Sequence, residues 1–515
     1  MMTTTVSQGS EPTDLGGRAF HLIGVGGAGM SVLAQLLAER GAAVTGSDAV
    51  GGDALDHLRA LGLGVVVGHD AAHVPPAATV VVSTAIKETN PELAAARERG
   101  QEVIHRSQAL ALAARGRDFV AVAGAHGKTT TSGMLAQALS VAGEDPSFAI
   151  GGVVRDLGTG AHLGAGRAFV AEADESDRSF LNYDPCLAVV TNVEPDHLDS
   201  YGTPEAFERA FLDFACRVRS GGRLIVCTDD PGGARLARAA AERGVLVTTY
   251  GATDTGPDGA GGRDGGARRA HVRVEVTERR AGGTSALLTL RSDEPGAGRV
   301  QDPARPQDED RAVIGPIALE LALPGDHVAL DAAGAWAAGL ELGVAPGVMA
   351  RALGSFGGTG RRFEARGEAA GVRVIDDYAH HPTEIEALLT AAREVADARG
   401  GRVLALFQPH LFSRTRAFAD RFGAALGRAD FVVVTSIYPA RETQEDFPDV
   451  TGATVADRVE GARARYVADH DRAARLLAEA ARPGDVALTI GAGDVTRLGP
   501  VILERLGAGQ DGPAQ

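Results

Sequence analysis

The stretch FVAVAGAHGKTTTSGML, residues 119–135, decides the fold of the middle of the chain. It predicts an apolar strand over 119–123, a glycine-bounded turn over 124–127 and a helix that begins near Lys128. Backbone N–H groups at such a turn point towards phosphate oxygens, and the helix dipole favours their negative charge. Lys128 can reach β- and γ-phosphates, and the Thr129 hydroxyl suits Mg²⁺. The predicted nucleotide site comprises Gly124, Ala125, His126, Gly127, Lys128, Thr129 and Thr130.

Lysine usage supports this reading of the turn. Lys87 and Lys128 are the only lysines among 51 Lys and Arg residues, so a compact ammonium stands where phosphate contact requires one. The longer pattern GxxxxGK[ST] would require glycine where Val122 stands, so the loop is a shorter GxxGKT variant. The alternative is an ordinary glycine-rich turn with a surface lysine.

Length and composition exclude several classes of protein. A chain of 515 residues predicts about three domains, and 44% hydrophobic with 23% charged residues is typical of globular chains. A net charge of −16 argues against nucleic-acid binding. No apolar run approaches the length of a membrane span, and the three cysteines have no CxxC spacing. We therefore expect a cytoplasmic protein without membrane insertion, as a monomer or a dimer.

Residues 17–116 predict a first, Rossmann-like domain. The segment AFHLIGVGGAGM reads as a strand and a glycine-rich turn with the GxGxxG spacing, followed by a helix and a second strand that ends at Asp48. Another buried strand ends near Ser83 and Thr84, where α/β sheets place ligands. We expect a nucleotide diphosphate on the turn; a turn chosen only for close packing is the alternative. The candidate residues are Gly24, Gly26, Gly27, Gly29, Met30, Asp48, Ser83 and Thr84.

Residues 117–356 predict a central domain in which two acidic stretches follow buried strands. AFVAEADESD (168–177) carries Glu172 and Glu175, and CLAVVTNVEPDHLD (186–199) carries His197. Parallel strands deliver their carboxyl ends to one edge of a sheet, so both stretches are expected beside the phosphate turn. Carboxylates suit Mg²⁺, and a histidine suggests a second metal position. We predict Glu172, or alternatively Glu175, and His197 as metal ligands; the alternative is that the acids are solvated helix caps.

Residues 357–508 predict a third α/β domain without a phosphate turn. Arg361 and Arg362 lie on a glycine-rich loop, and the segment VRVIDDYAHHPTE ends a strand and begins a helix with a capping box at Thr383 and Glu386. Surface ion pairs are the alternative role for the arginines. Before this domain, about residues 251–311 read as flexible tracts around a β-hairpin of HVRVEVTE and SALLTLR.

Seven motifs in order resemble those of the Mur ligase family over residues 18–506. They are HLIGVGGAGM, AGAHGKTTT, AEADESDRSFL, TNVEPDHLDSYG, DDYAHHPTE, FQPHLFSRTR and TIGAGD. The resemblance implies a Rossmann-like domain for a UDP-sugar, a central ATPase-like parallel sheet and a C-terminal Rossmann-like domain that closes over an amino acid. It is strongest with members that join L-alanine to UDP-N-acetylmuramate.

The resemblance also implies a mechanism and further residues. ATP would phosphorylate the muramoyl carboxylate, and the amine of L-alanine would attack the acyl phosphate. Thr129 and Glu172 would hold one Mg²⁺, and His197 a second. The remaining implied contacts are Arg361 or Arg362 on the γ-phosphate, Asp376, His380 and Arg414 on the amino-acid side, and His327 and Asp331 on the adenine side.

Three departures and three rival functions accompany the resemblance. Ala125 replaces the usual Thr, Val328 and Asp331 replace asparagines of GxHNxxN, and Leu411 replaces the arginine of QPHR. A relative that adds murein tripeptide to the same sugar is the nearest rival. The others are a nucleotide-dependent switch without ligase activity and an NAD dehydrogenase, which the central phosphate turn opposes.

Overall fold

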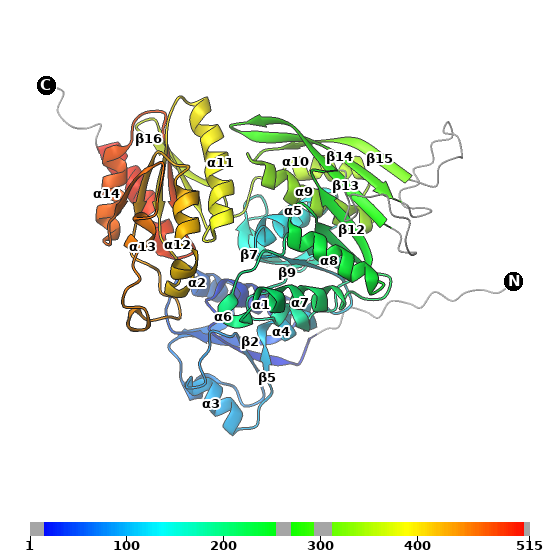
Figure 1. Ribbon diagram of the computed structural model, residues 1–515. Helices are drawn as coiled ribbons and strands as arrows, with labels where there is room; N and C mark the ends of the chain where they lie inside the picture. Colours follow the sequence, from blue (N-terminus) through cyan, green and yellow to red (C-terminus); the bar gives the residue numbers. More distant parts are fainter. Residues whose placement is uncertain (1–14, 254–268, 293–311, 509–515) are drawn as a thin grey trace. The chain divides into compact units, whose positions relative to one another are not determined.

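The computed structural model describes residues 15–253, 269–292 and 312–508 (Figure 1). The chain divides into two compact units. The first comprises Met1–Glu275, Leu287–Leu319 and Leu330–Phe356, and the second comprises Val276–Ala286, Glu320–Ala329 and Gly357–Gln515. Among the described helices, none combines the length and apolar character that crossing a membrane requires.

The first sheet is five-stranded and parallel, in the order β3-β2-β1-β4-β5. The order reverses at β1, so the turn after β1 lies at the point where α/β sheets bind ligands. This is the Rossmann-like arrangement predicted for the start of the chain. Its elements are β1 (Ala19–Ile23), α1 (Ala28–Glu39), β2 (Ala43–Asp48), α2 (Asp53–Ala60), β3 (Gly64–Val67), η1 (Ala71–His73), β4 (Thr79–Val82), α3 (Pro91–Glu98), β5 (Val103–His105) and α4 (Arg106–Ala113).

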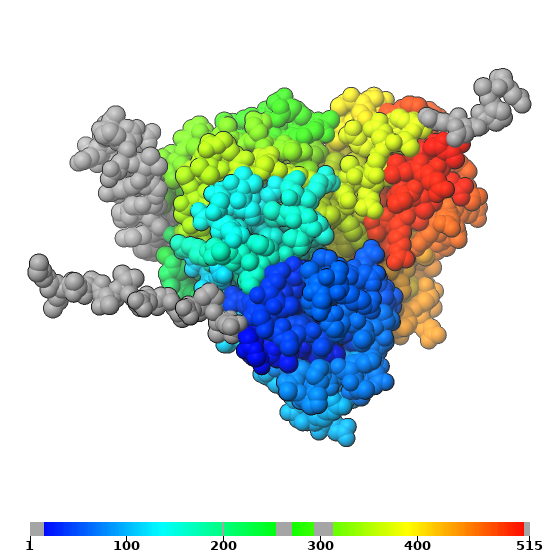
Figure 2. All heavy atoms as spheres, turned by 180° about the vertical axis from the view of Figure 1, so that it is seen from behind, coloured from blue at the N-terminus to red at the C-terminus, as the bar shows by residue number. Residues whose placement is uncertain are grey.

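Helices cover both faces of this sheet. Apolar side chains of α1, α2 and α4 join one core, and those of α3 pack with Ile23 and Val80 in another. Figure 2 shows the residues of this sheet and its helices as a continuous blue surface. Because both faces are covered, the strands read as apolar runs, such as Thr79–Val82.

A buried carboxylate ties α3 to the first sheet. Glu92 is fully buried and accepts hydrogen bonds from Ser47 and from Nε2 of His21, the latter at 3.3 Å. Its other oxygen accepts from the N–H of Asp70 at 3.2 Å and lies 3.2 Å from Nδ1 of His73. Burial raises the pKa of Glu92, but these hydrogen bonds outweigh it and hold the pKa at about 2.

The second sheet has ten strands in the order β15-β14-β13-β12-β11-β10-β6-β9-β7-β8. Strands β13 to β7 in this order pair in parallel, and β7 pairs with β8 antiparallel. Strand β6 lies between β10 and β9, which are the two strands that precede the acidic stretches. The strands are β6 (Asp118–Ala123), β7 (Ser147–Val154), β8 (Thr159–His162), β9 (Ala168–Glu172), β10 (Leu187–Val190), β11 (Arg223–Cys227), β12 (Leu246–Gly251), β13 (Arg269–Arg280), β14 (Gly283–Ser292) and β15 (Ala312–Leu321).

Helices also cover this sheet. Aromatic side chains of α7, such as Phe207 and Phe211, share a core with Phe119 of β6, whereas α5 packs with α10. Figure 1 shows α7 and α8 together on one side of the sheet. The helical elements are α5 (Lys128–Val141), η2 (Ser179–Asn182), α6 (Leu198–Tyr201), α7 (Pro204–Ala215), α8 (Pro231–Glu242), α9 (Asp326–Glu341) and α10 (Pro346–Gly354).

The third sheet lies in the second unit, in the order β16-β17-β21-β18-β19-β20. Only the pairing of β16 with β17 is antiparallel. Helices α11, α12 and α13 contribute to one core, and α14 and α15 to the other. The elements are β16 (Glu364–Ala369), β17 (Val372–Asp377), α11 (Pro382–Ala398), β18 (Val403–Phe407), α12 (Phe412–Leu426), β19 (Phe431–Val434), η3 (Gln444–Asp446), α13 (Ala453–Ala456), β20 (Arg463–Tyr466), α14 (His470–Ala480), β21 (Val486–Ile490), η4 (Asp494–Arg497) and α15 (Leu498–Ala508).

Three sheets confirm the predicted α/β architecture, while the domain boundaries after residues 116 and 356 stay predictions. The predicted hairpin is present as β13 and β14, which are neighbours in the second sheet. The tracts 254–268 and 293–311, for which we predicted flexibility, lie outside the described residues. The predicted capping box at Thr383 and Glu386 is wrong: the box lies two residues earlier, with His381 as the N-cap and Glu384 accepting from the N–H of His381 at 3.1 Å.

Candidate active site

The phosphate turn lies between β6 and α5, as predicted. Gly124 has φ +137° and Gly127 has φ +81°, which are conformations that favour glycine. A β-carbon on Gly124 would lie 2.0 Å from Oγ1 of Thr191, so the close approach of the next strand also requires glycine there. Gly127 is the N-cap of α5, so the first N–H groups of this long helix open towards the turn.

The residues that follow β10 hold the turn in place. The N–H of Thr191 donates to the carbonyl of Ala123 at 3.0 Å, and its hydroxyl donates to the carbonyl of His126. Asn192 accepts from the N–H of His126 at 3.1 Å and donates to its carbonyl at 3.0 Å. Thr191 opens the quoted motif TNVEPDHLDSYG, but we predicted no role for it from the sequence.

Lys128 begins α5, and acidic groups surround its ammonium. Its Nζ lies 2.8 Å from Oε2 of Glu175 and donates to the carbonyl of Gly124 at 2.5 Å. Burial lowers the pKa of Lys128, but the attraction of Glu175, Asp174 and Glu172 outweighs burial and raises the pKa above 10.5. One lysine thus stands among three carboxylates, and burial raises the pKa of one of them, Glu175, to about 7. A further cation beside Glu175 would favour its ionised form.

Of the two carboxylates proposed as metal ligands, Glu175 lies close to other predicted site residues. It is 1% exposed, and its Oε1 lies 3.7 Å from Nε2 of His197. Glu172 ends β9 instead, and its Oε1 accepts from the N–H of Gly151 at 2.7 Å. The structure therefore brings Lys128, Glu175 and His197 together, and it gives Glu172 a bond to the neighbouring strand.

His197 has an uncommon backbone conformation. Its φ is +51°, and its N–H donates to the carboxylate of Asp196 at 2.7 Å. Strain of this kind costs about 1–3 kcal/mol and is frequent at functional sites. The conformation therefore supports a functional role for the side chain that it orients.

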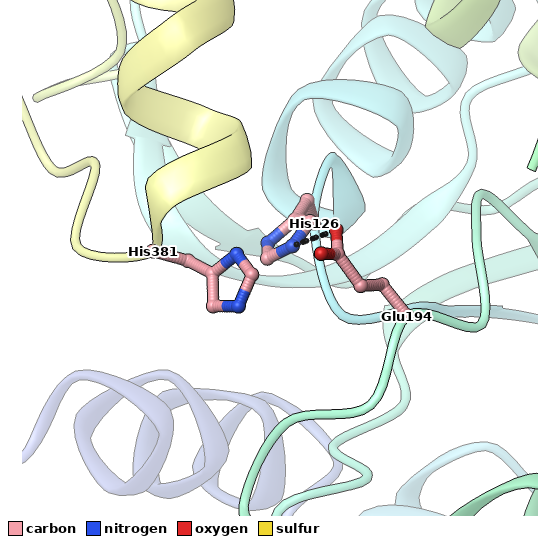
Figure 3. A group of neighbouring side chains, drawn as sticks. All are labelled: His126, Glu194 and His381. Carbon is pink, nitrogen blue, oxygen red and sulfur yellow. Dashed lines mark ion pairs between the residues drawn. The ribbon is translucent and has the colours of Figure 1, made fainter. Parts of the chain in front are cut away.

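A second ion pair lies on the turn itself. Nε2 of His126 is 3.4 Å from Oε2 of Glu194, which follows β10 (Figure 3). The pair joins the turn to the second acidic stretch, beside the two hydrogen bonds that Asn192 makes with the backbone of His126. His381, also labelled in Figure 3, is the N-cap of α11 in the second unit.

Asp331 lies on α9, beside the phosphate turn. A β-carbon on Gly127 would be 2.6 Å from its Oδ1, and Asp331 is 9% exposed. His327 lies one turn earlier on α9 and is exposed. The contact of these two residues with adenine stays a prediction.

The first glycine-rich turn follows β1, and Gly27 is the N-cap of α1. The carboxylate of Asp48 accepts from the N–H of Gly26 at 2.9 Å, so its observed partner is the turn. Met30 is 3% exposed and packs in the core, and its N–H donates to Gly27. Gly24 has φ +79° and allows the tight turn, and Gly29 is exposed on the first turn of α1.

Ser83 and Thr84 follow β4 at the same edge of the first sheet. The hydroxyl of Thr84 donates to the carboxylate of Asp177 at 3.1 Å. Asp177 belongs to the acidic stretch after β9, so the edges of the two sheets are bonded to each other within the first unit.

In the second unit, Arg361 and Asp376 form part of a bonded network. Arg361 donates to the carbonyl of Gly491 at 2.6 Å, and Nε of Arg361 lies 3.4 Å from Oδ2 of Asp376. Asp376 is fully buried and accepts from the hydroxyls of Thr489 and Thr496 at 2.6 and 2.8 Å. This burial gives Asp376 a structural role, whatever else it contacts.

The other predicted residues of this unit gather around aromatic rings. The guanidinium groups of Arg361 and Arg362 lie 4.8 and 5.3 Å from the ring centroid of Tyr378. The ring of His380 is 5.4 Å from that of Tyr378. Arg414 is 6% exposed, and its Nη1 lies 3.5 Å from Nδ1 of His410. Leu411, which replaces an expected arginine, is 3% exposed.

Comparison with known proteins matches three segments of the chain to domains of one family. Residues 19–118 match the catalytic domain of the Mur ligase family, 122–288 the Mur ligase middle domain, and 361–493 the glutamate ligase domain of Mur ligases. A UDP-N-acetylmuramate–L-alanine ligase of Kineococcus radiotolerans is 52% identical over 94% of this chain and 96% of its own length. The chain belongs to the Mur ligase family.

Other members are similar over nearly the whole chain. A UDP-N-acetylmuramate–L-alanine ligase of Mycobacterium tuberculosis is 46% identical, covering 96% of both chains. The crystal structure of a UDP-N-acetylmuramate–alanine ligase of Thermotoga maritima superimposes with a TM-score of 0.72 at 25% identity, over 95% of this chain and 99% of that one. These matches confirm the three-domain Mur ligase architecture for this chain.

Proposed function

We propose that this chain is an ATP-dependent ligase that joins L-alanine to the carboxylate of UDP-N-acetylmuramate, a step in the synthesis of peptidoglycan precursors. Relatives that carry this activity in their names are 46–52% identical over at least 94% of the chain. The observation that carries the proposal is the phosphate turn between two acidic strand ends, in a chain with a separate glycine-rich turn. Two turns of this kind suit two phosphate-bearing substrates.

The donor set around the phosphate turn fits Mg²⁺. Glu175 and Glu172 offer carboxylate oxygens and Thr129 a hydroxyl, and hard oxygen ligands are those that Mg²⁺ prefers. Three carboxylates lie close enough to Lys128 to raise its pKa, so a divalent cation would reduce the excess negative charge. We place Glu175 before Glu172 as a ligand because of its position beside Lys128, and keep His197 for a second cation. Mg²⁺ would neutralise phosphate charge during transfer.

The chain's own groups position the transferred phosphoryl. The N–H groups of the turn and the ammonium of Lys128 hold the β- and γ-phosphates. The γ-phosphoryl group passes to the muramoyl carboxylate, and ADP leaves. The amine of L-alanine then attacks the acyl carbon, and the tetrahedral intermediate collapses to the amide and inorganic phosphate. Positioning and charge neutralisation supply most of the catalysis in such transfers.

The remaining roles follow the domain order. The first turn, Gly24 to Met30, binds the diphosphate of the UDP-sugar, and the edge with Ser83 and Thr84 lies beside it. Arg361 or Arg362 contacts the γ-phosphate, and His380 and Arg414 contact the amino acid. The cytoplasmic location and the number of subunits stay predictions from the sequence.

The direct test measures phosphate release by the purified chain with ATP, Mg²⁺, UDP-N-acetylmuramate and L-alanine, and omits each component in turn. Release should require all four, and mass spectrometry should find the alanyl amide. Release that persists without the sugar or the amine would contradict the ligase and favour a nucleotide-dependent switch. Murein tripeptide in place of L-alanine tests the nearest rival, which predicts faster release with the tripeptide.

A further inference from the structure

The acidic loop between β9 and η2 is bonded to the first sheet's elements as well as to the phosphate turn. Asp177 accepts from the hydroxyl of Thr84 at 3.1 Å, and its Oδ2 lies 3.4 Å from Nε2 of His105. Asn182, the last residue of η2, donates to the hydroxyl of Ser107 at 2.7 Å. These contacts lie within the first unit, so this loop is fixed by the domain with the first glycine-rich turn.

One arginine lies at the centre of these contacts. Arg106 begins α4, and its side chain is 22% exposed. Its Nη2 donates to Oδ2 of Asp174, and its Nη1 lies 3.4 Å from the position that a β-carbon on Gly29 would take. Gly29 belongs to the first turn of α1. A single guanidinium therefore lies against the first glycine-rich turn with one nitrogen and against the acidic loop with another. We call this turn, Gly24 to Met30, the sugar-nucleotide turn after the substrate proposed for it.

Asp174 connects Arg106 to the loop backbone. Its Oδ2 accepts a hydrogen bond from Arg106, and its Oδ1 accepts from the N–H of Ser176 at 2.9 Å, which fixes the backbone around Glu175. Glu175 in turn lies 2.8 Å from the ammonium of Lys128. Asp174 and Glu175 are adjacent in the chain, so the residue that binds Arg106 is joined directly to the residue that binds Lys128.

We propose that Arg106 is a positioning residue that couples the sugar-nucleotide turn to the ATP site. A diphosphate beside Gly29 attracts the guanidinium, and this attraction changes how firmly Arg106 holds Asp174. The position of Asp174 sets the position of Glu175 and hence of Lys128. Coupling between two sites is reciprocal, so ATP must alter sugar affinity by the same factor. This inference rests on the proposed function, because it needs the UDP-sugar on the first turn.

The experiment measures the dissociation constant of a non-hydrolysable ATP analogue by calorimetry, with and without saturating UDP-N-acetylmuramate and with Mg²⁺ throughout. We expect the ratio of the two constants to differ from one by about tenfold in the wild-type chain, a common size for coupled sites. Arg106→Met should bring the ratio close to one. Arg106→Lys, which keeps the charge but loses the forked geometry, should give an intermediate ratio.

Gln35→Met is the matched control, because Gln35 also bonds the first domain to the second sheet, donating to the carbonyl of Ala161 at 3.3 Å. It should keep the wild-type ratio. Asp174→Asn should lower the ratio as Arg106→Met does, and the double variant should lower it no further.

Two outcomes would overturn the inference. The first is a wild-type ratio in Arg106→Met; if sugar affinity falls while the ratio stays intact, Arg106 is a ligand contact only. The second is an equal loss of the ratio in Gln35→Met. A wild-type chain that does not bind UDP-N-acetylmuramate would contradict the proposed function itself, whereas full turnover with an unchanged ratio in Arg106→Met overturns the coupling alone.

Discussion

Gly124→Ala is expected to destabilise the first unit and to weaken nucleotide binding. The new β-carbon would lie 2.0 Å from Oγ1 of Thr191 and 3.1 Å from the N of Asn192, at a φ of +137° that side chains rarely allow. Backbone strain of this kind costs about 1–3 kcal/mol. Overpacking against a fixed strand end costs about 1–3 kcal/mol more. The sum is about 4 kcal/mol in mid-range, which corresponds to a fall in Tm of roughly 8–16 °C.

Gly143→Ala supplies the control for backbone strain. Gly143 follows the other end of α5 with φ +86°, and a β-carbon there meets nothing within 4 Å. It should therefore cost only the strain, about 1 kcal/mol, and lower Tm by roughly 2–4 °C.

The assays are calorimetric unfolding and titration with a non-hydrolysable ATP analogue. Because the turn carries the N–H groups that hold phosphate, its displacement in Gly124→Ala should weaken the analogue at least about tenfold, or 1.4 kcal/mol. Gly143→Ala should bind normally. The reasoning is refuted if Gly124→Ala unfolds within about 2 °C of Gly143→Ala and binds the analogue as the wild type does.

Lys128→Met should lower kcat by roughly 10²–10³-fold and leave UDP-N-acetylmuramate affinity unchanged in calorimetry; equal losses of both would contradict its placement. The pKa of Glu92 is about 2 in the folded chain, compared with the ordinary glutamate value of 4.5. Its ionised form therefore stabilises the fold above pH 4.5, and that contribution is lost as pH falls through 2. Glu92→Gln should therefore lower the free energy of unfolding by about 3 kcal/mol at pH 7. It should also flatten the dependence of this free energy on pH in urea titrations; an unfolding curve like that of the wild type would contradict the role of Glu92. EDTA should abolish activity until Mg²⁺ returns, and Glu175→Gln should raise the Mg²⁺ needed about tenfold; an unchanged requirement would remove Glu175 as a ligand.

The features that depend on short spacings or on strand order were predictable from the sequence. The glycines, the lysine and the apolar run of the phosphate turn are adjacent in the chain, so they specify strand, turn and helix without further information. Both acidic stretches lie beside the turn because β9 and β10 pair with β6 in parallel. Parallel pairing brings their carboxyl ends to one edge whatever the intervening chain does.

The choice between neighbouring carboxylates was not predictable. Glu172 and Glu175 are three residues apart, where the strand has ended and no periodicity says which side chain faces Lys128. The path of the loop decides this, and that path depends on bonds to distant residues such as Thr84 and Ser107. The prediction of the N-cap of α11 was wrong for a related reason. The local pattern suits both Thr383 and His381, and Pro382 at the first helical position sets the start of the helix.

Charge balance explains why the acidic loop needs both of its basic partners. Asp174 and Glu175 are adjacent carboxylates, and like charges this close raise each other's free energy in a partly buried site. Arg106 pairs with Asp174, and Lys128 pairs with Glu175. Removing Arg106 takes away the guanidinium that Asp174 binds. Asp174 also accepts from the N–H of Ser176, so this change reaches the loop backbone around Glu175. A change at the sugar-nucleotide turn that moves Arg106 therefore has a direct physical route to Lys128, without any movement of the second unit.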